Sequence, residues 1–384
     1  MSAVTSVVAG DECCGVADEY NDDEDELPLL LEHVNLNIPN ASLGEKFYVD
    51  LLGGQLNPAG TTPWQVHINL GASQLHCPFA ALPSHGGQLF HVAQIWDGYI
   101  ELLTTEELGV VRDRIESHKA RVSEQTRGES QMCATVVDNG DTLLVSCPWG
   151  NTYKLNQVPL GHSVPAAHPG GSRSLVAMPR VLHWIAHGSA APIAAFFTKV
   201  LGCPSQLNAA GGEFCCTIPF VTGQTLVFQE ISSNIGDAEL SGSHNVGKVS
   251  AESAETAPLV AGTVNNAMVP PSFVAIDAYD TGELRAYHLA LYLGSDAGFE
   301  RAFRKAEGAG LIYSNPRFEG GKPEFSNALT WEEARISRQF RVKNLCDPQR
   351  DPGSAESAGR LGMVLELEIR APGHVSYPKK TRSP

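Results

Sequence analysis

The sequence predicts an α+β protein built from two similar halves. Strand patterns follow one another without a helix between every pair, an opening strand–helix pattern occurs twice, and a Pro-, Gly-, Ser- and Ala-rich segment separates the two copies. A doubly wound parallel sheet needs a helical crossover at each strand, so the first observation favours α+β. A chain of 384 residues is long enough for two domains, each with its own core.

The first predicted domain spans residues 28–156. Apolar and polar residues alternate over 33–38, which is typical of a strand with one buried face. Leu43, Phe47 and Leu51 repeat at a spacing of four, which predicts a helix over 43–52 that ends at Gly53. Further strands are predicted at 64–70, 73–77 and 98–103, followed by a helix over 105–118 and a hairpin over 142–156.

The second predicted domain spans residues 179–376 and follows a linker over 157–178. Its opening repeats the first: Ala195–Gly202 mirrors Lys46–Gly53, and a histidine precedes the final glycine by 19 residues (His183) against 20 (His33). Strands are expected at 181–185, 214–220, 224–229, 287–293, 340–345 and 363–369, with a helix over 296–308. The insertion 232–270 is rich in Ser, Ala, Gly and Asn, which predicts a mobile loop.

Composition limits the classes of partner. The formal net charge of −16 and the lack of a basic patch argue against nucleic acid. No apolar run approaches a membrane span. The acidic segment 1–27 predicts a disordered tail without a secretory signal, and 377–384 a second tail. Nine cysteines without a C-x2-C pair predict reduced thiols, and together these features favour a cytoplasmic protein.

Three short segments carry a family likeness. The motifs His-Val-Asn-Leu-Asn-Ile-Pro (33–39), Phe-Tyr-x-x-Leu-Leu-Gly-Gly (47–54) and Cys-Pro-Trp-Gly-Asn (147–151) resemble the vicinal-oxygen-chelate superfamily, which includes glyoxalase I, the bleomycin-resistance proteins and the extradiol dioxygenases. The resemblance covers residues 30–156 and 180–376. It implies paired βαβββ modules, two to each half, that form curved open sheets, or cups. Two such halves in one chain form a pseudo-dimer, which predicts a monomer.

The resemblance also implies one divalent metal ion (Zn, Fe, Mn, Co or Ni) for the chain. Family positions fall on His33 and His76 in the first half and on His288 and Glu366 in the second. A site that crosses between the halves unites these four. The remaining set, His183, Gly98 and Lys154, cannot hold a metal, because a protonated lysine repels a cation. Glu368 shares a strand face with Glu366 and is an alternative ligand, and His91 is an alternative to Gly98.

Three functions are compatible with these residues. The first is a glyoxalase-like lyase or isomerase, in which a metal chelates the vicinal oxygens of a small substrate and Glu366 also serves as general base. The second is a non-catalytic module that sequesters an organic ligand. The third is an extradiol-type dioxygenase whose ligands, His183, His288 and Glu366, all come from the second half.

Overall fold

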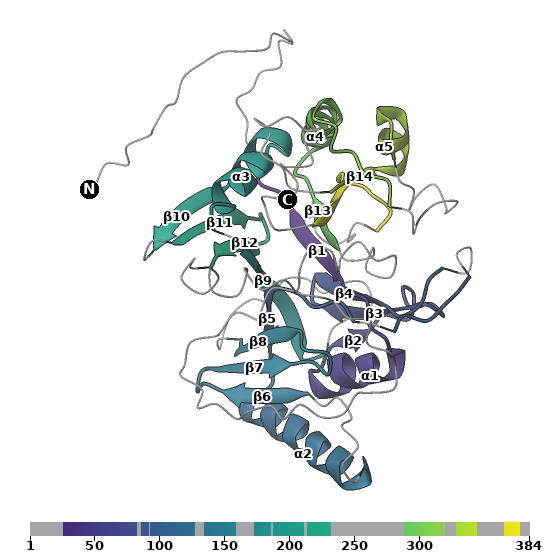
Figure 1. The fold of residues 1–384 in the computed structure, drawn as a ribbon, viewed down its shortest axis with the longest axis vertical. Coiled ribbons are helices and arrows are strands. Elements are labelled where there is room, and N and C mark those ends of the chain that lie inside the picture. The colour runs from purple at the N-terminus through teal and green to yellow at the C-terminus, as the bar shows by residue number, and fades with distance from the viewer. Residues whose placement is uncertain are drawn as a thin grey trace, which may run out of the picture.

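The structure is a computed structural model that describes residues 26–82, 86–91, 93–126, 134–158, 173–185, 187–210, 213–231, 288–315, 318, 328–343 and 365–376. The predicted mobile segments 1–27 and 232–270 lie outside these residues, apart from Glu26 and Leu27, and so does the predicted tail 377–384. Two mixed sheets and the helices packed on them make up the described chain (Figure 1).

The first sheet has seven strands in the order β14-β15-β13-β1-β4-β3-β2. The first half contributes β1 (Leu30–Asn35), β2 (Gln55–Leu56), β3 (Gln65–Leu70) and β4 (Ser73–Pro78). The second half contributes β13 (His288–Tyr292), β14 (Gln339–Lys343) and β15 (Glu366–Arg370). The antiparallel pair β1–β13 joins the two contributions at the centre of the sheet.

The second sheet has eight strands in the order β10-β11-β12-β9-β5-β8-β7-β6. The first half contributes β5 (Gly98–Thr104), β6 (Thr135–Asp138), β7 (Thr142–Ser146) and β8 (Thr152–Gln157). The second half contributes β9 (Leu175–Ile185), β10 (Gln206–Ala210), β11 (Glu213–Pro219) and β12 (Thr225–Glu230). The antiparallel pair β5–β9 joins them.

A helix follows the first strand of each module, and one more helix, α5 (Trp331–Ser337), directly precedes β14. The helices after the first strands are α1 (Ala41–Glu45), which continues as the π-helix η1 (Lys46–Leu51); α2 (Leu108–Thr126); α3 (Ala190–Ala195), which continues as the π-helix η3 (Phe196–Val200); and α4 (Asp296–Gly308). The helix expected over 43–52 is therefore a short α-helix and a π-turn. Asn40 caps it, because its side chain accepts a hydrogen bond from the Leu43 amide.

The two sheets share one strand plan. Read from opposite ends, their orders match place for place, with β1 corresponding to β9, β13 to β5, β15 to β8 and β4 to β12, and β6 is an additional edge strand. The predicted α+β fold of paired βαβββ modules is confirmed. Each half supplies one module to each sheet, so the halves are interleaved and neither forms a sheet by itself.

One expected boundary differs from the structure. The linker was expected to end at residue 178, yet β9 begins at Leu175, and Leu175 to Met178 are buried. Ala177 and Leu175 pair with Leu103 and Thr104 of β5. The extended β5 offers backbone partners and an apolar surface to this segment, which outweighs its loop-like composition. The part of the linker over 159–172 lies outside the described residues.

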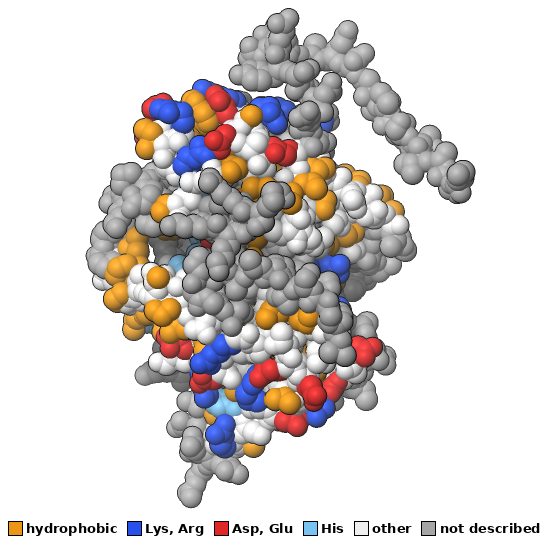
Figure 2. All heavy atoms as spheres, turned by 180° about the vertical axis from the view of Figure 1, so that it is seen from behind, with side chains coloured by type: hydrophobic (Ala, Val, Ile, Leu, Met, Phe, Trp, Pro, Cys, Tyr) orange, Lys and Arg blue, Asp and Glu red, His pale blue; other side chains and the backbone are white. Residues whose placement is uncertain are grey.

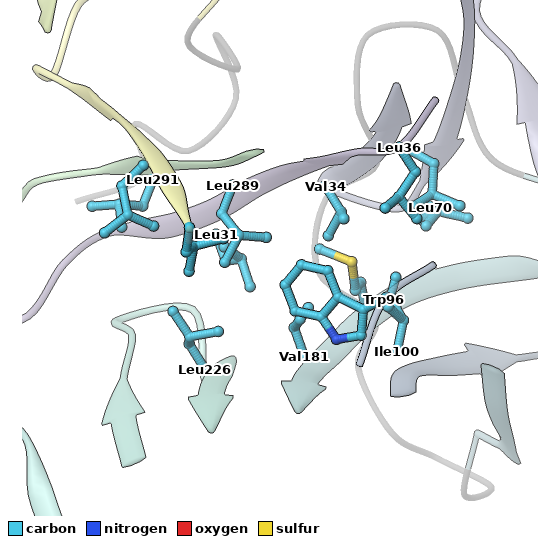
Figure 3. Close-up of a cluster of buried hydrophobic side chains, with 14 of the residues drawn as sticks. Leu31, Val34, Leu36, Leu70, Trp96, Ile100, Val181, Leu226, Leu289 and Leu291 are labelled. Atoms are coloured by element: carbon cyan, nitrogen blue, oxygen red, sulfur yellow. The ribbon is translucent and has the colours of Figure 1, made fainter. Parts of the chain in front are cut away.

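The main core lies between the two sheets. Figure 3 shows Leu31, Leu289 and Leu291 of the first sheet facing Val181 and Leu226 of the second. Burial of such side chains contributes roughly 1.5–3 kcal/mol each to folding. Since this core uses one face of every central strand, the other face of each sheet is left for function.

The helices, cysteines and surface charges of the described residues do not point to a particular function. No described helix is both long and apolar enough to cross a membrane. The five cysteines that the structure places are free thiols. On the face shown in Figure 2, acidic and basic side chains are interspersed among apolar ones.

Candidate functional site

A band of buried polar side chains covers the face of the seven-stranded sheet that points away from the core. His33 of β1 lies on this face, as do His288 of β13, Glu368 of β15 and His76 of β4, and all four are at most 9% exposed. Strand register explains the grouping, because Asn35 pairs with both His288 and His76 across neighbouring strands. Buried charged and imidazole groups are costly unless partnered, so their partners define the site.

Two imidazoles form its centre. Nε2 of His33 lies 3.0 Å from Nε2 of His288. Nδ1 of His33 lies 2.5 Å from Oε2 of Glu32, a carboxylate that can only accept, so Nδ1 carries the donated proton. This contact orients the ring and directs the Nε2 lone pair of His33 towards His288.

A carboxylate completes the group. Oε2 of Glu368 lies 3.4 Å from Nε2 of His288, and one ligand atom from each of His33, His288 and Glu368 lies within 4.8 Å of the other two. Donor atoms bound about 2.0–2.2 Å from a four- or six-coordinate ion lie about 2.8–3.6 Å apart. The two measured separations fall in that range. Two imidazoles and one carboxylate are also a donor set that suits Zn, Fe, Mn, Co or Ni, so these residues fit one divalent ion.

Two buried arginines hold the carboxylates in place. Arg341 of β14 donates to Oε1 of Glu366 and to Oε2 of Glu368. Arg370 of β15 donates to Oε1 of Glu368 at 2.5 Å and to Oε2 of Glu32 at 2.6 Å. Both oxygens of Glu368 thus accept from a guanidinium: Nε and Nη2 of Arg370 both lie 2.5 Å from Oε1, while Oε2 also lies 3.4 Å from Nε2 of His288.

The second oxygen of Glu366 has a different donor. Asn315 Nδ2 donates to its Oε2 at 2.8 Å, while Arg341 engages Oε1. The carboxyl is therefore held by two donors beside the site, and it pairs in the sheet with His288. Burial raises the pKa of Glu366 above its ordinary value, although Arg341 opposes the shift.

The pKa values of His288, Glu368 and Glu32 are all lowered, by burial in the histidine and by neighbouring positive charges in the two carboxylates. Burial lowers the pKa of His288 to about 3, so this imidazole is neutral at pH 7. Burial alone would raise the pKa of Glu368, but Arg341 and Arg370 outweigh it and lower that pKa well below its ordinary value. In the same way, Arg370 and His33 overcome burial and lower the pKa of Glu32 to about 2. A neutral imidazole and ionised carboxylates are the forms that bind cations.

A β-bulge positions Glu32 beside His33. Neighbouring strand residues normally point to opposite faces, but the β1–β13 register shifts between Leu31 and His33. Leu31 therefore points into the core, while His33 and its carboxylate partner Glu32 both serve the polar face. Without the bulge, His33 would share the core face with Leu31.

His76, a predicted ligand, lies next to the centre. Its ring stacks on that of His33 with 3.8 Å between centroids, and its Nε2 lies 2.9 Å from Oε1 of Gln74. On its other side it stacks on His67 at 3.7 Å. Burial, followed by the nearby His33 and His67, lowers the pKa of His76 well below its ordinary value.

The four predicted ligands all belong to the seven-stranded sheet, as a site crossed between the halves requires. His33 and His288 meet directly, and His76 packs on His33. At the carboxylate position the compact donor group contains Glu368, the alternative named from the sequence, while Glu366 is hydrogen-bonded to Arg341 and Asn315.

The ligand set drawn wholly from the second half is not formed, which corrects that alternative. His183 belongs to β9 of the other sheet. Its ring points into the core, 4.6 Å from the ring of Trp96 and 6.3 Å from that of Phe228. Its Nδ1 contacts the backbone oxygen of Trp184 at 3.0 Å. His183 is thus a core residue of the eight-stranded sheet, whereas His288 lies on the far face of the seven-stranded sheet.

Sequence patterns did not identify Glu32, Arg341 or Arg370, nor Asn315, which donates to Glu366. Glu32 directly precedes His33, but a regular strand would place it on the opposite face, so only the bulge reveals its role. Arg341 and Arg370 gave a weak signal as charged residues inside otherwise apolar strand patterns. Their pairing with Glu368 depends on the order of β14, β15 and β13.

Comparisons with known proteins gave structural likenesses only. No family model matches the chain, and no curated protein matches it. Two variants of glyoxalase I from Zea mays are 11% and 12% identical, cover 93% and 90% of this chain and 96% and 92% of their own, and have TM-scores of 0.40 and 0.41. A lactoylglutathione lyase from Agrobacterium tumefaciens is 14% identical over 34% of this chain and 94% of its own, with a TM-score of 0.21. The activity therefore has to be inferred from this chain's own side chains.

Proposed function

We propose that the protein is a metal-dependent, glyoxalase-like lyase or isomerase that acts on a small oxygenated substrate. The supporting observation is the pair of buried imidazole nitrogens 3.0 Å apart, with a carboxylate oxygen 3.4 Å from one of them. In this proposal His33, His288 and Glu368 hold one divalent ion. The bound ion supplies Lewis-acid chemistry, which suits a substrate with two vicinal oxygens.

The residues around the ligands have separate tasks in the proposal. Glu32 fixes the orientation of His33 through Nδ1, and Arg370 fixes Glu32. Glu366 carries the proton between substrate atoms, because it lies beside the donor group and its two oxygens are held by Arg341 and Asn315. A carboxyl at a fixed position within reach of the substrate is what general acid–base catalysis needs.

Metal analysis tests the ligand set. The purified protein is reconstituted with Zn²⁺, Mn²⁺, Co²⁺ or Ni²⁺, dialysed and measured by plasma mass spectrometry, with about one ion per chain expected. His288→Ala and Glu368→Gln should lose the ion, since each removes a ligand. His183→Ala is the matched control and should retain it. Equal metal content in His288→Ala and the wild type would refute the proposed ligands.

Activity tests the role of Glu366. The hemithioacetal of methylglyoxal and a thiol is the first substrate to test, since it offers vicinal oxygens and needs proton transfer. Glu366→Gln keeps one oxygen that can accept from Arg341 but cannot take up a proton, and its amide nitrogen cannot accept the hydrogen bond from Asn315. We expect it to retain the metal and lose at least about a hundredfold in turnover.

The arginine pairing favours a second candidate, a non-catalytic binding module. Both oxygens of Glu368 already accept from Arg341 and Arg370, so the charges of the site are paired without a cation. A site of this kind can bind an organic ligand through its buried donors. If the wild-type protein takes up no metal in the reconstitution above, this candidate replaces the first.

A further inference from the structure

The eight-stranded sheet has its own face turned away from the core, and its residues are of a different kind. Tyr99, Leu182 and Val227 form an apolar cluster there that is separate from the main core. Trp184 and Cys215 pack against it and are half-buried. These three central residues are 7–8% exposed, whereas the charged side chains two positions along the same strands are more open: Arg180 is 45% and Glu101 15% exposed.

Strand register shows what replaces the metal ligands on this face. The pairing of β1 contains one irregularity and that of β9 with β5 contains two. The first paired residue after the last irregularity is His33 in β1 and Arg180 in β9. Across the sheet, Arg180 pairs with Glu101, which pairs in turn with Lys154. Because Ala290 and Glu368 occupy the matching places in the first sheet, Lys154 stands where Glu368 stands.

Glu101 and Lys154 are incompletely partnered, while Nε of Arg180 donates to Oγ1 of Thr225 at 3.3 Å. Oε1 of Glu101 accepts from Asn156 at 2.6 Å, but its Oε2 is buried without a hydrogen bond and lies 3.9 Å from Nη1 of Arg180. Within the described chain, Lys154 has no side-chain hydrogen bond or ion pair. A buried carboxylate oxygen without a donor costs about 1–3 kcal/mol, and a bound donor removes that cost.

We propose that this face binds a small α-amino acid with an apolar side chain. The ligand carboxylate would contact Lys154 and Arg180, and its ammonium would donate to the free oxygen of Glu101. Its side chain would lie on Tyr99, Leu182 and Val227. The charged row and the apolar row are two residues apart along their strands, which is about 7 Å. That spacing matches the distance from the charged groups of an amino acid to the far end of an apolar side chain.

Alternatives with one charge fit this face less well. A divalent cation is repelled by Arg180 and Lys154. A plain carboxylate leaves the Glu101 oxygen without a donor, and a plain amine leaves Lys154 without an acceptor. A zwitterion satisfies both, and a face that hydrogen-bonds a ligand group discriminates strongly against an analogue lacking it. The proposed site is independent of the metal proposed for the other sheet.

Calorimetric titration of the full chain in EDTA tests the assignment. The ligands are L-phenylalanine, L-leucine, 3-phenylpropionate and phenethylamine. We expect one amino-acid site per chain, with each single-charge analogue at least about tenfold weaker. Lys154→Met and Glu101→Gln should each weaken L-phenylalanine by about tenfold or more. The exposed Lys199→Met serves as the matched control and should leave the affinity unchanged.

The outcomes separate this site from the other one. Because His288 lies in the other sheet, the His288→Ala variant should bind L-phenylalanine as the wild type does. The proposal is overturned if neither amino acid binds below about 10 mM, if the analogues bind equally well, or if Lys154→Met leaves the affinity unchanged. Loss of binding in His288→Ala would also overturn it. The analogue comparison uses wild-type protein, so it remains decisive even if a variant fails to fold.

Discussion

Replacing His183 with phenylalanine should remove a measurable part of the acid sensitivity of this protein. Burial among Trp96 and Phe228 lowers the pKa of His183 to about 4. In the unfolded chain the same imidazole titrates near its ordinary pKa of about 6.5. Between these two values the unfolded state binds a proton that the folded state excludes. The contribution of His183 to stability is therefore complete above about pH 6.5 and falls as the pH drops towards 4.

The size of the effect follows from the two pKa values. The gap between about 6.5 and the folded pKa of about 4 corresponds to a total of about 3 kcal/mol. At pH 5, where most but not all of the difference has developed, the loss is about 2 kcal/mol. Solvent screens this effect little, because the ring is enclosed in the core. In His183→Phe this portion of the pH dependence disappears, while that of all other groups remains.

Urea unfolding at pH 7.5 and pH 5 measures the difference. Intrinsic fluorescence is a suitable probe, since Trp96 is buried next to His183. The drop in unfolding free energy between the two pH values should be about 2 kcal/mol smaller in His183→Phe than in the wild type. Exposed His187→Gln is the control and should keep the wild-type drop. Equal drops in wild type and His183→Phe would show that His183 is not enclosed in the core, which would undermine its exclusion from the metal site.

Three further predictions concern single contacts. Glu32→Gln should weaken metal affinity about 10- to 100-fold without abolishing binding, because the hydrogen bond that orients Nδ1 of His33 becomes weaker. Competition with a chelating dye measures this affinity. Complete loss of binding would indicate that Glu32 is itself a ligand. Tyr48→Phe should cost about 1–3 kcal/mol in thermal unfolding, because Tyr153 loses its 2.8 Å buried hydroxyl partner, and a double Phe variant should cost less than the two single variants added together. Gly71→Ala should cost several-fold more than Gly223→Ala by denaturant unfolding: both glycines have positive φ (71° and 79°), but a Cβ at Gly71 would lie 1.9 Å from the Val176 oxygen while Gly223 faces open space.

Local sequence patterns were sufficient to predict most helices and strands. Spacing-four leucine and phenylalanine residues over 43–52 depend on neighbours in the chain, so the helix could be predicted without tertiary information. The strand predicted over 33–38 with one buried face lies at Leu30–Asn35 and is buried on both faces, because the polar face is covered as well. The repeat of this opening at Ala195–Gly202 also predicted two matching sets of modules, and the two strand orders agree. The crossed grouping of His33 with His288 was predicted from the family resemblance and from the unequal distribution of ligand types between the halves.

Strand register, which depends on the tertiary structure, decided the rest. The repeated sequence pattern matches His33 with His183, but the irregularity in β1 falls directly before His33, while the second of the two irregularities in β9 falls before Arg180. An extra residue in one strand reverses the direction of every side chain beyond it. His33 therefore points to the polar face and His183 into the core, although both lie in similar strand patterns. The choice between Glu366 and Glu368 likewise depended on where Arg341 and Asn315 lie in space, and residues so far apart in sequence leave no local pattern.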